Sequence, residues 1–158
     1  MIDEKICDYI SDIMDSYPDR VVIGYSNINK VSDREDYISL TSSGIDLQIG
    51  SSREYDSESE KEKFVTYFKK RATVTFFGEN AESNAYRFIN IQNSQMARDA
   101  QKKYEITFLR GGGVNSLKNQ IGDYFISTYE IEVMIQYSSS LEIDTKRIEE
   151  IPLNYKGE

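Results

Sequence analysis

The longest regular alternation of apolar and polar residues in the chain covers residues 123–137 (DYFISTYEIEVMIQY). Its even-numbered positions are mixed and include Glu130 and Glu132. Its odd-numbered positions are almost all apolar, with Ser127 as the exception: Phe125, Tyr129, Ile131, Val133, Ile135 and Tyr137. Because successive side chains of a strand point to opposite faces, the pattern predicts a long strand with one buried face. We expect the rest of the fold to be organised around it.

The segments before this strand predict a second strand, a helix and a third strand that cover its apolar face. Residues 64–77 alternate again, with Phe64, Phe68, Ala72, Val74 and Phe76 on one face. The segment around residues 81–100 has helical spacing, with Asn80 as the expected N-cap and with Lys102 and Lys103 in the last turn. One face of this helix comprises Ala81, Ala85, Phe88, Ile89, Gln92 and Met96. Residues 104–109 (YEITFL) predict the third strand, and we expect Phe88 and Ile89 to face the core.

The N-terminal quarter of the chain predicts shorter elements. Residues 2–16 have apolar positions at helical spacing opposite acidic ones, which indicates an amphipathic helix that ends before Pro18. Residues 20–25 (RVVIGY) predict a short strand, followed by a polar loop. Residues 37–40 and 45–49 alternate on either side of the sequence SSG, which predicts a hairpin turn.

Four segments lack a clear apolar pattern. Residues 50–63 (GSSREYDSESEKEK) have no branched aliphatic residue and many charges, so we expect a mobile acidic loop. The glycines at 111–113 predict a turn, because no Lys-Ser or Lys-Thr pair follows to make a phosphate-binding loop. Residues 114–122 predict a short helical turn. Residues 141–158 have sparse isoleucines among charges, which predicts a C-terminal arm that contacts neighbouring chains.

Composition narrows the possible functions. A length of 158 residues fits a single domain over residues 1–158. The formal net charge of −8 argues against binding to nucleic acid through its phosphates. The absence of histidine removes the commonest metal ligand and general base, and Cys7 as the lone cysteine excludes an internal disulfide. With no long apolar stretch and an acidic N-terminus, we expect a soluble protein made in the cytoplasm.

The middle and end of the chain resemble the neck or tail terminator proteins of tailed bacteriophages. The resemblance covers residues 64–153 and lies in the order and length of the elements. These are a strand ending in Gly78, a helix rich in small residues, another strand and a long aromatic strand. Single positions such as Arg71, Ala81 and Ala85 also agree. The resemblance implies an α+β fold with a curved, mainly antiparallel sheet and helices packed on one side.

The same resemblance implies a virion structural protein without catalytic, cofactor-binding or metal-binding residues. In that family, the protein forms a ring, here expected to be hexameric. The ring ends the tail tube and joins it to the neck or connector protein, while DNA passes through the lumen without specific binding. We therefore expect the protein in the virion, at the neck or tail, after synthesis in the cytoplasm of the bacterial host, with no membrane contact.

Two other classes of function remain open from the residues alone. Glu130 and Glu132 lie two positions apart on one face of the longest predicted strand, a spacing of about 7 Å that suits a bound cation. They are the best candidates for a small carboxylate-based enzyme, although solvent-facing polarity explains them more simply. A non-viral oligomeric adaptor is the other alternative.

Overall fold

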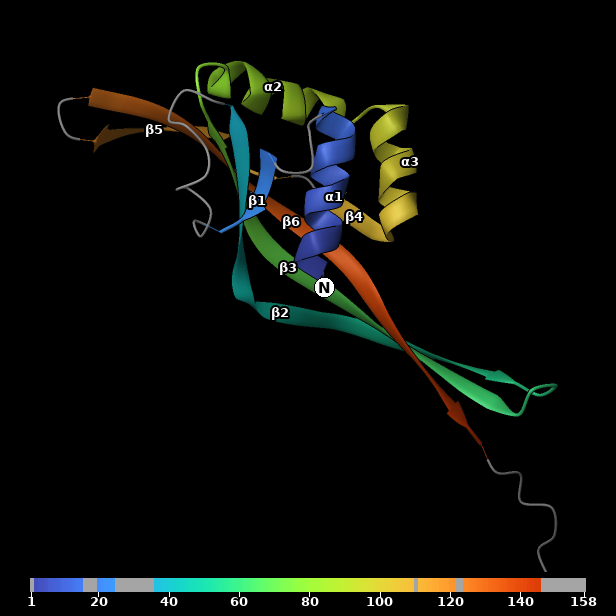
Figure 1. Ribbon diagram of the computed structural model, residues 1–158. Helices are drawn as coiled ribbons and strands as arrows, with labels where there is room; N and C mark the ends of the chain where they lie inside the picture. Colours follow the sequence, from blue (N-terminus) through green and yellow to red (C-terminus); the bar gives the residue numbers. More distant parts are fainter. Residues whose placement is uncertain (1, 16–19, 25–35, 110, 122–123, 146–158) are drawn as a thin grey trace, which may run out of the picture.

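A computed structural model describes residues 2–15, 20–24, 36–109, 111–121 and 124–145. In this part of the chain, helices lie on one side of a mainly antiparallel, twisted sheet (Figure 1). The elements are α1 (Ile2–Met14), β1 (Val21–Ile23), β2 (Tyr37–Asp56), β3 (Lys61–Phe77), α2 (Ala81–Ile91), α3 (Gln95–Tyr104), β4 (Ile106–Leu109), β5 (Val114–Ile121) and β6 (Tyr124–Asp144). The α+β class implied by the family resemblance is therefore confirmed.

Strand β6 lies at the centre of the sheet. The order is β1-β2-β3-β6-β4, and β5 also pairs with β6. All neighbours are antiparallel except β1 and β2, which are parallel. One edge of β6 pairs with β3, and the other edge pairs with β4 and then β5. The long strand predicted over residues 123–137 is thus confirmed, and it continues to Asp144.

The core lies between the helices and the odd-numbered face of β6. Ile131, Val133 and Ile135 are buried there, as the alternation predicts. Phe88 of α2 is also buried, with its ring 5.7 Å from Phe76 and 6.2 Å from Phe108 between ring centroids. Ile89 is half-buried against the same cluster, and the side chain of Phe125 lies outside the described residues.

Helix α1 packs over β1 and β2 on the same side of the sheet and against α3. Its buried residues Ile6, Tyr9, Ile10 and Ile13 follow the predicted helical spacing. The Tyr9 ring stacks on Phe108, with ring centroids 4.6 Å apart. The predicted strand at residues 20–25 is present as the shorter β1, whereas Pro18 and most of the predicted polar loop lie outside the described residues.

The prediction of one helix over residues 81–100 is wrong. The chain forms α2 and α3 with a break at residues 92–94, and α3 continues to Tyr104, where a strand was expected. Ser94 makes the break, because its hydroxyl accepts a hydrogen bond from the Ala97 amide and caps α3. Asn80 does not cap α2 through its side chain. It donates instead to the carboxylate of Asp36, at 2.8 Å.

Three further predictions about local structure are wrong. Residues 37–56 form the single strand β2, which bulges near Gly44 in place of the predicted hairpin turn. Residues 50–63 are not a loop but the end of β2, a turn at residues 57–60 and the start of β3. Residues 114–122 were expected to make a helical turn, but residues 114–121 form β5. In all three segments, main-chain pairing with a neighbouring strand supplies the hydrogen bonds that the side-chain pattern does not reveal.

The sheet extends beyond the helices at both ends (Figure 1). At one end, β2, β3 and β6 continue together as a feature that we call the distal arm, comprising residues 45–69 and 136–144. Thr145 ties the end of β6 to the arm tip, because its amide and hydroxyl both donate to the Glu60 carbonyl. At the other end, β5 and the first residues of β6 form a hairpin. The predicted C-terminal arm at 141–158 therefore begins as strand, and its residues from 146 lie outside the described part.

Replacing Ile131 or Phe88 by alanine should lower the free energy of unfolding by about 2–5 kcal/mol, because each change leaves a cavity in the core. Urea titration of the purified protein measures this loss. Leu47→Ala is the matched control, since Leu47 is 62% exposed, and it should change the free energy by less than about 0.5 kcal/mol. Unchanged urea midpoints for the two core variants would contradict this packing.

Candidate functional site

One carboxylate of the predicted pair on β6, Glu132, has an ordinary structural partner. Glu130 and Glu132 lie on the sheet face away from the helices, as their register opposite Thr75 and Thr73 of β3 shows. The Glu132 carboxylate lies 3.0 Å from the Arg71 guanidinium, and both side chains are more than half exposed. Within the described residues, no set of three or more acidic or cysteine side chains is placed to hold a metal. This geometry fits a surface ion pair.

The glycines at 111–113 allow two backbones to approach each other. The Gly112 amide donates a hydrogen bond to the Glu132 carbonyl at 2.8 Å. A Cβ atom on Gly111 would lie 2.5 Å from the same carbonyl oxygen, closer than a side chain allows. The segment thus leads from β4 to β5 along one edge of β6, as a connection without regular structure.

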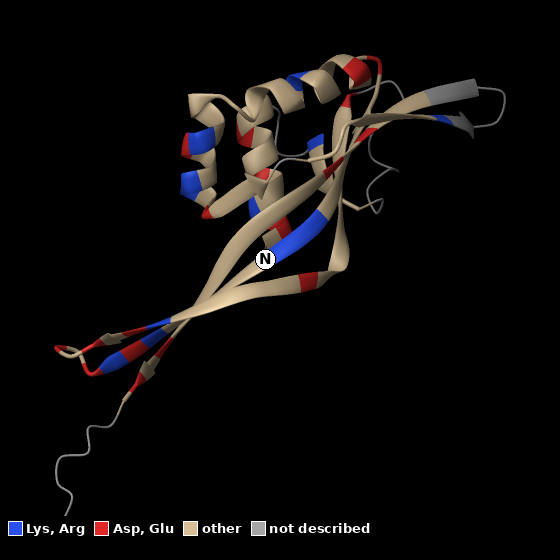
Figure 2. Cartoon of the chain, turned by 180° about the vertical axis from the view of Figure 1, so that it is seen from behind, with Lys and Arg blue, Asp and Glu red and all other residues tan. Residues whose placement is uncertain are grey.

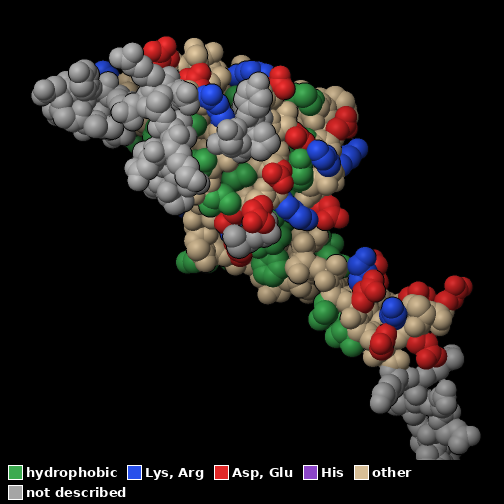
Figure 3. Space-filling view, in the orientation of Figure 1, with side chains coloured by type: hydrophobic (Ala, Val, Ile, Leu, Met, Phe, Trp, Pro, Cys, Tyr) green, Lys and Arg blue, Asp and Glu red, His purple; other side chains and the backbone are tan. Residues whose placement is uncertain are grey.

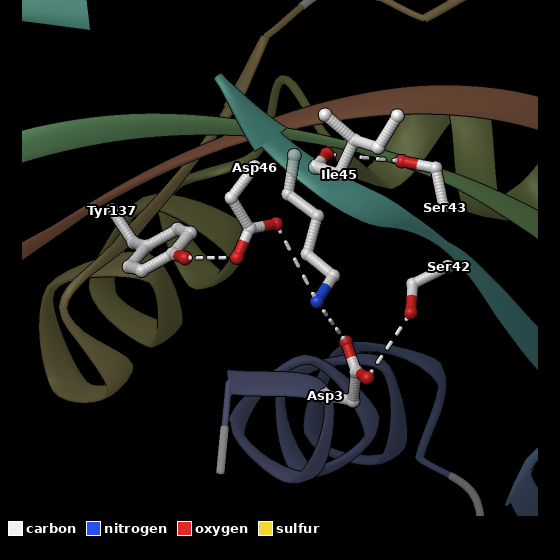
Figure 4. A network of polar contacts seen from close by, with 7 residues as sticks. Asp3, Ser42, Ser43, Ile45, Asp46 and Tyr137 are labelled. Carbon is white, nitrogen blue, oxygen red and sulfur yellow. Dashed lines mark hydrogen bonds and ion pairs between the residues drawn. The ribbon is translucent and has the colours of Figure 1, made fainter. Parts of the chain in front are cut away.

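A buried lysine joins the N-terminus to the sheet (Figure 4). Lys70 is 8% exposed, and its ammonium lies 3.2 Å from Asp3 Oδ1 and 3.6 Å from Asp46 Oδ1. Ser42 donates to the other Asp3 oxygen at 3.0 Å, and Tyr137 donates to Asp46 at 2.6 Å. Burial and the hydrogen bond to the Asp46 carboxylate raise the pKa of Tyr137 to about 12, so the phenol remains a neutral donor at physiological pH. The network connects α1, β2, β3 and β6.

Sequence reasoning missed this network, although a signal for it exists. Lys70 lies on the same parity as Phe68 and Ala72, so a lysine stands where the alternation predicts a buried residue. A buried ammonium requires anionic partners. The partners Asp3 and Asp46 come from distant parts of the chain, and the sequence offers many acids from which to choose.

The distal arm combines acidic charge with exposed apolar side chains. It contains eight acidic and four basic residues, a net charge of −4. Figure 2 shows both signs interleaved toward the arm tip. At the tip, Asp56 accepts hydrogen bonds from the Glu58 amide and the Ser59 hydroxyl and so shapes the turn. Those bonds, with Ser59 first, lower the pKa of Asp56, which keeps the tip anionic.

Apolar side chains stay on the surface of the arm beside these charges (Figure 3). Of the eleven large apolar side chains that are exposed in the described residues, seven belong to the arm: Ile45, Leu47, Ile49, Tyr55, Tyr67, Leu141 and Ile143. Exposed apolar side chains that gather in one region mark a surface for contact with another molecule. The arm is therefore the best candidate for an interaction site in the described part of the chain.

A comparison with known families identifies the chain. A sequence profile described as phage neck terminator protein matches residues 3–158. The chain belongs to this family. None of the curated proteins matches the sequence.

Membership confirms the resemblance inferred from the order of strands and helices, and it extends the match to nearly the whole chain. A neck terminator protein fits a structural role in the phage particle and contacts with other head or tail proteins. The arm offers a surface for such contacts. Among the described residues, no helix is long and apolar enough to cross a bilayer.

Lys70→Met should destabilise this neck terminator protein by about 3–5 kcal/mol, because Asp3 and Asp46 would lose their buried cation. Urea titration at neutral pH measures the loss. Lys69→Met is the control, since its side chain is half-buried next to Lys70 in the sequence, and the change should cost less than about 1 kcal/mol. Equal effects of the two substitutions would show that the network does not anchor α1 to the sheet.

Proposed function

We propose that this protein forms a ring, most simply of six chains, that ends the tail tube and joins it to the neck or connector protein. Family membership supports a structural role at the phage neck, and the exposed apolar residues of the distal arm support contacts with other chains. The number six comes from the resemblance to terminator proteins. The protein is then a component of the virion, made in the cytoplasm of the bacterial host.

The charges of the arm decide which of its surfaces suits a neighbouring chain. Within the described residues, no strand pairs with the outer edge of β2 beyond Leu40 or with that of β6 beyond Tyr137. Both free edges end in acids, Glu54 and Asp56 on β2 and Glu142 and Asp144 on β6. Like charges opposite each other destabilise strand pairing, so edge-to-edge contact of two arm tips is disfavoured.

The apolar face of the arm suits a neighbour better. Phe64 and Leu141 are opposite each other in the register, as are Glu62 and Ile143, and Tyr55 is the partner of Glu62 on β2. These side chains of β3 and β6 lie on the same face of the sheet as the core residues, beyond the part that the helices cover. Leu141 and Ile143 are 60% and 46% exposed, so burial against a neighbour would remove apolar surface from water.

The acidic charge supports passage of DNA without adhesion. Each chain has a formal net charge of −8, so six chains together have about −48. Acidic groups that face a lumen repel phosphates over a Debye length of about 8 Å at physiological salt. The ring therefore holds the tail tube protein and the connector through protein contacts, and DNA moves through it without specific binding.

Light scattering should give a mass of about 110 kDa for the protein assembled alone, as six chains of 18.3 kDa require. Leu141→Glu with Ile143→Glu should stop assembly and leave the urea midpoint unchanged, because both side chains are exposed in the single chain. Met96→Glu on α3 is the control, since Met96 is 48% exposed outside the arm, and it should assemble normally.

Two results would contradict the proposal. The first is a chain that stays monomeric and also fails to bind purified tail tubes. The second is tight binding of the protein to duplex DNA at physiological salt, because phosphate affinity is incompatible with a lumen that lets DNA slide.

A further inference from the structure

A groove of about 760 Å³ lies between the end of α2 and the glycine segment. Its sides are formed by Ile89 and Gln92 on one side and by Phe108, Leu109 and residues 111–113 on the other. Ile131 and Val133 of β6 contribute to its floor. The described residues that line it are all uncharged, whereas 29% of the residues in the chain are charged. Arg110, between Leu109 and Gly111, lies outside the described residues. The described lining therefore suits an uncharged segment with both apolar and amide groups.

The sequence around the groove keeps it open. Gly111 cannot be replaced by a larger residue without a clash against the Glu132 carbonyl, and the three glycines contribute no side chains of their own to fill the groove. Gln92 accepts a hydrogen bond from the Tyr9 hydroxyl at 2.6 Å through Oε1. Its amide nitrogen is buried and has no hydrogen-bond partner among the described residues.

We propose that this groove binds the C-terminal segment, residues 146–158, of a second copy of the same chain. The segment contains IPLNY at residues 151–155, an uncharged run between Glu149 and Glu150 on one side and Lys156 on the other. Pro152 restricts the backbone to extended conformations, which lowers the entropy lost on binding. Three apolar side chains in five residues match the apolar side chains of Ile89, Phe108 and Leu109 in the groove.

The distance that the C-terminal segment can span decides whether it binds the groove of its own chain or the groove of a second copy. Val133 and Thr145 are twelve residues apart, which corresponds to about 40 Å along the direction of β6. The segment leaves from Thr145, which is fixed at the arm tip by its two hydrogen bonds to Glu60. Residues 151–155 reach at most about 20–35 Å from Thr145 even when fully extended. The uncharged run therefore falls short of its own groove, and a second copy must provide the groove.

Such a contact joins two different surfaces, the C-terminal segment of one copy and the groove of the next. Each copy offers one of each, so the contact is heterologous and closes into a ring when the rotation between copies allows it. The inference rests on the proposed ring and identifies one of its contacts. The proposed contact also gives a function to the glycine segment at residues 111–113, for which the sequence predicts only a turn.

A synthetic fluorescent peptide of residues 146–158 tests the contact by anisotropy. The full chain with Ile151→Asp and Leu153→Asp serves as receptor, because its own C-terminal segments then leave the groove free. We expect saturable binding that is at least about tenfold weaker when the receptor also has Leu109→Glu, a change in the groove wall. Leu47→Glu on the exposed arm is the matched control and should leave binding unchanged. A peptide with Ile151→Asp and Leu153→Asp should also bind at least about tenfold more weakly.

Cross-linking shows which chain supplies the segment. In a Cys7→Ser background, Asn93→Cys at the groove and Leu153→Cys are placed on two differently tagged populations of the full chain, which are then mixed. We expect cross-links between the two tags. Absence of saturation up to about 1 mM peptide would overturn the proposal, and so would equal binding to the Leu109→Glu receptor. If rings still form in either case, the proposed function stands and only this contact is refuted.

Discussion

The fold depends on the pairing of both edges of β6. This strand has β3 along one edge and β4 followed by β5 along the other, so its backbone hydrogen bonds connect the second half of the chain to the first. Its odd-numbered face then determines where the helices pack, because Ile131, Val133 and Ile135 need cover from water. The close approach of Gly111 and Gly112 to Glu132 lets one edge stay continuous across the change from β4 to β5.

Strand β6 has a buried section, which stabilises the fold, and an exposed section on the distal arm, whose apolar side chains do not contribute to the core. Ile135 is fully buried under the helices, whereas Ile143 on the same parity is 46% exposed on the distal arm. The backbone of the arm is held by pairing among β2, β3 and β6, so the arm needs little side-chain burial to keep its shape. Its apolar side chains therefore remain available for a neighbouring chain. Lys70, with Asp3 and Asp46, links α1 to the sheet near the start of this arm.

The sequence predicts the elements whose side chains alternate strongly and misses those that depend on partners distant in sequence. Residues 123–137 and 64–77 are identified correctly, because one face of each strand is buried and the period of two is unbroken over most of its length. Residues 50–63 have no such pattern, since both faces of the arm meet water there, and only pairing among β2, β3 and β6 makes them strands. Residues 114–121 are missed for the same reason. The break between α2 and α3 depends on one local cap, Ser94, inside an otherwise helical pattern.

The candidate interaction sites were also missed from the sequence, because they depend on contacts between distant segments. The order of elements was enough to identify the family, because order and length do not require knowledge of contacts. The arm, the groove beside the glycines and the Lys70 network each combine residues from three or more segments, and sequence alone does not place these segments together.

We propose that this protein is a structural component of the phage particle at the junction between head and tail. Electron microscopy of purified phage particles, labelled with an antibody against this chain, tests it most directly. The account predicts one band of label at the neck of each particle and none elsewhere. Label distributed along the tail, or particles with intact necks and no label, would contradict it.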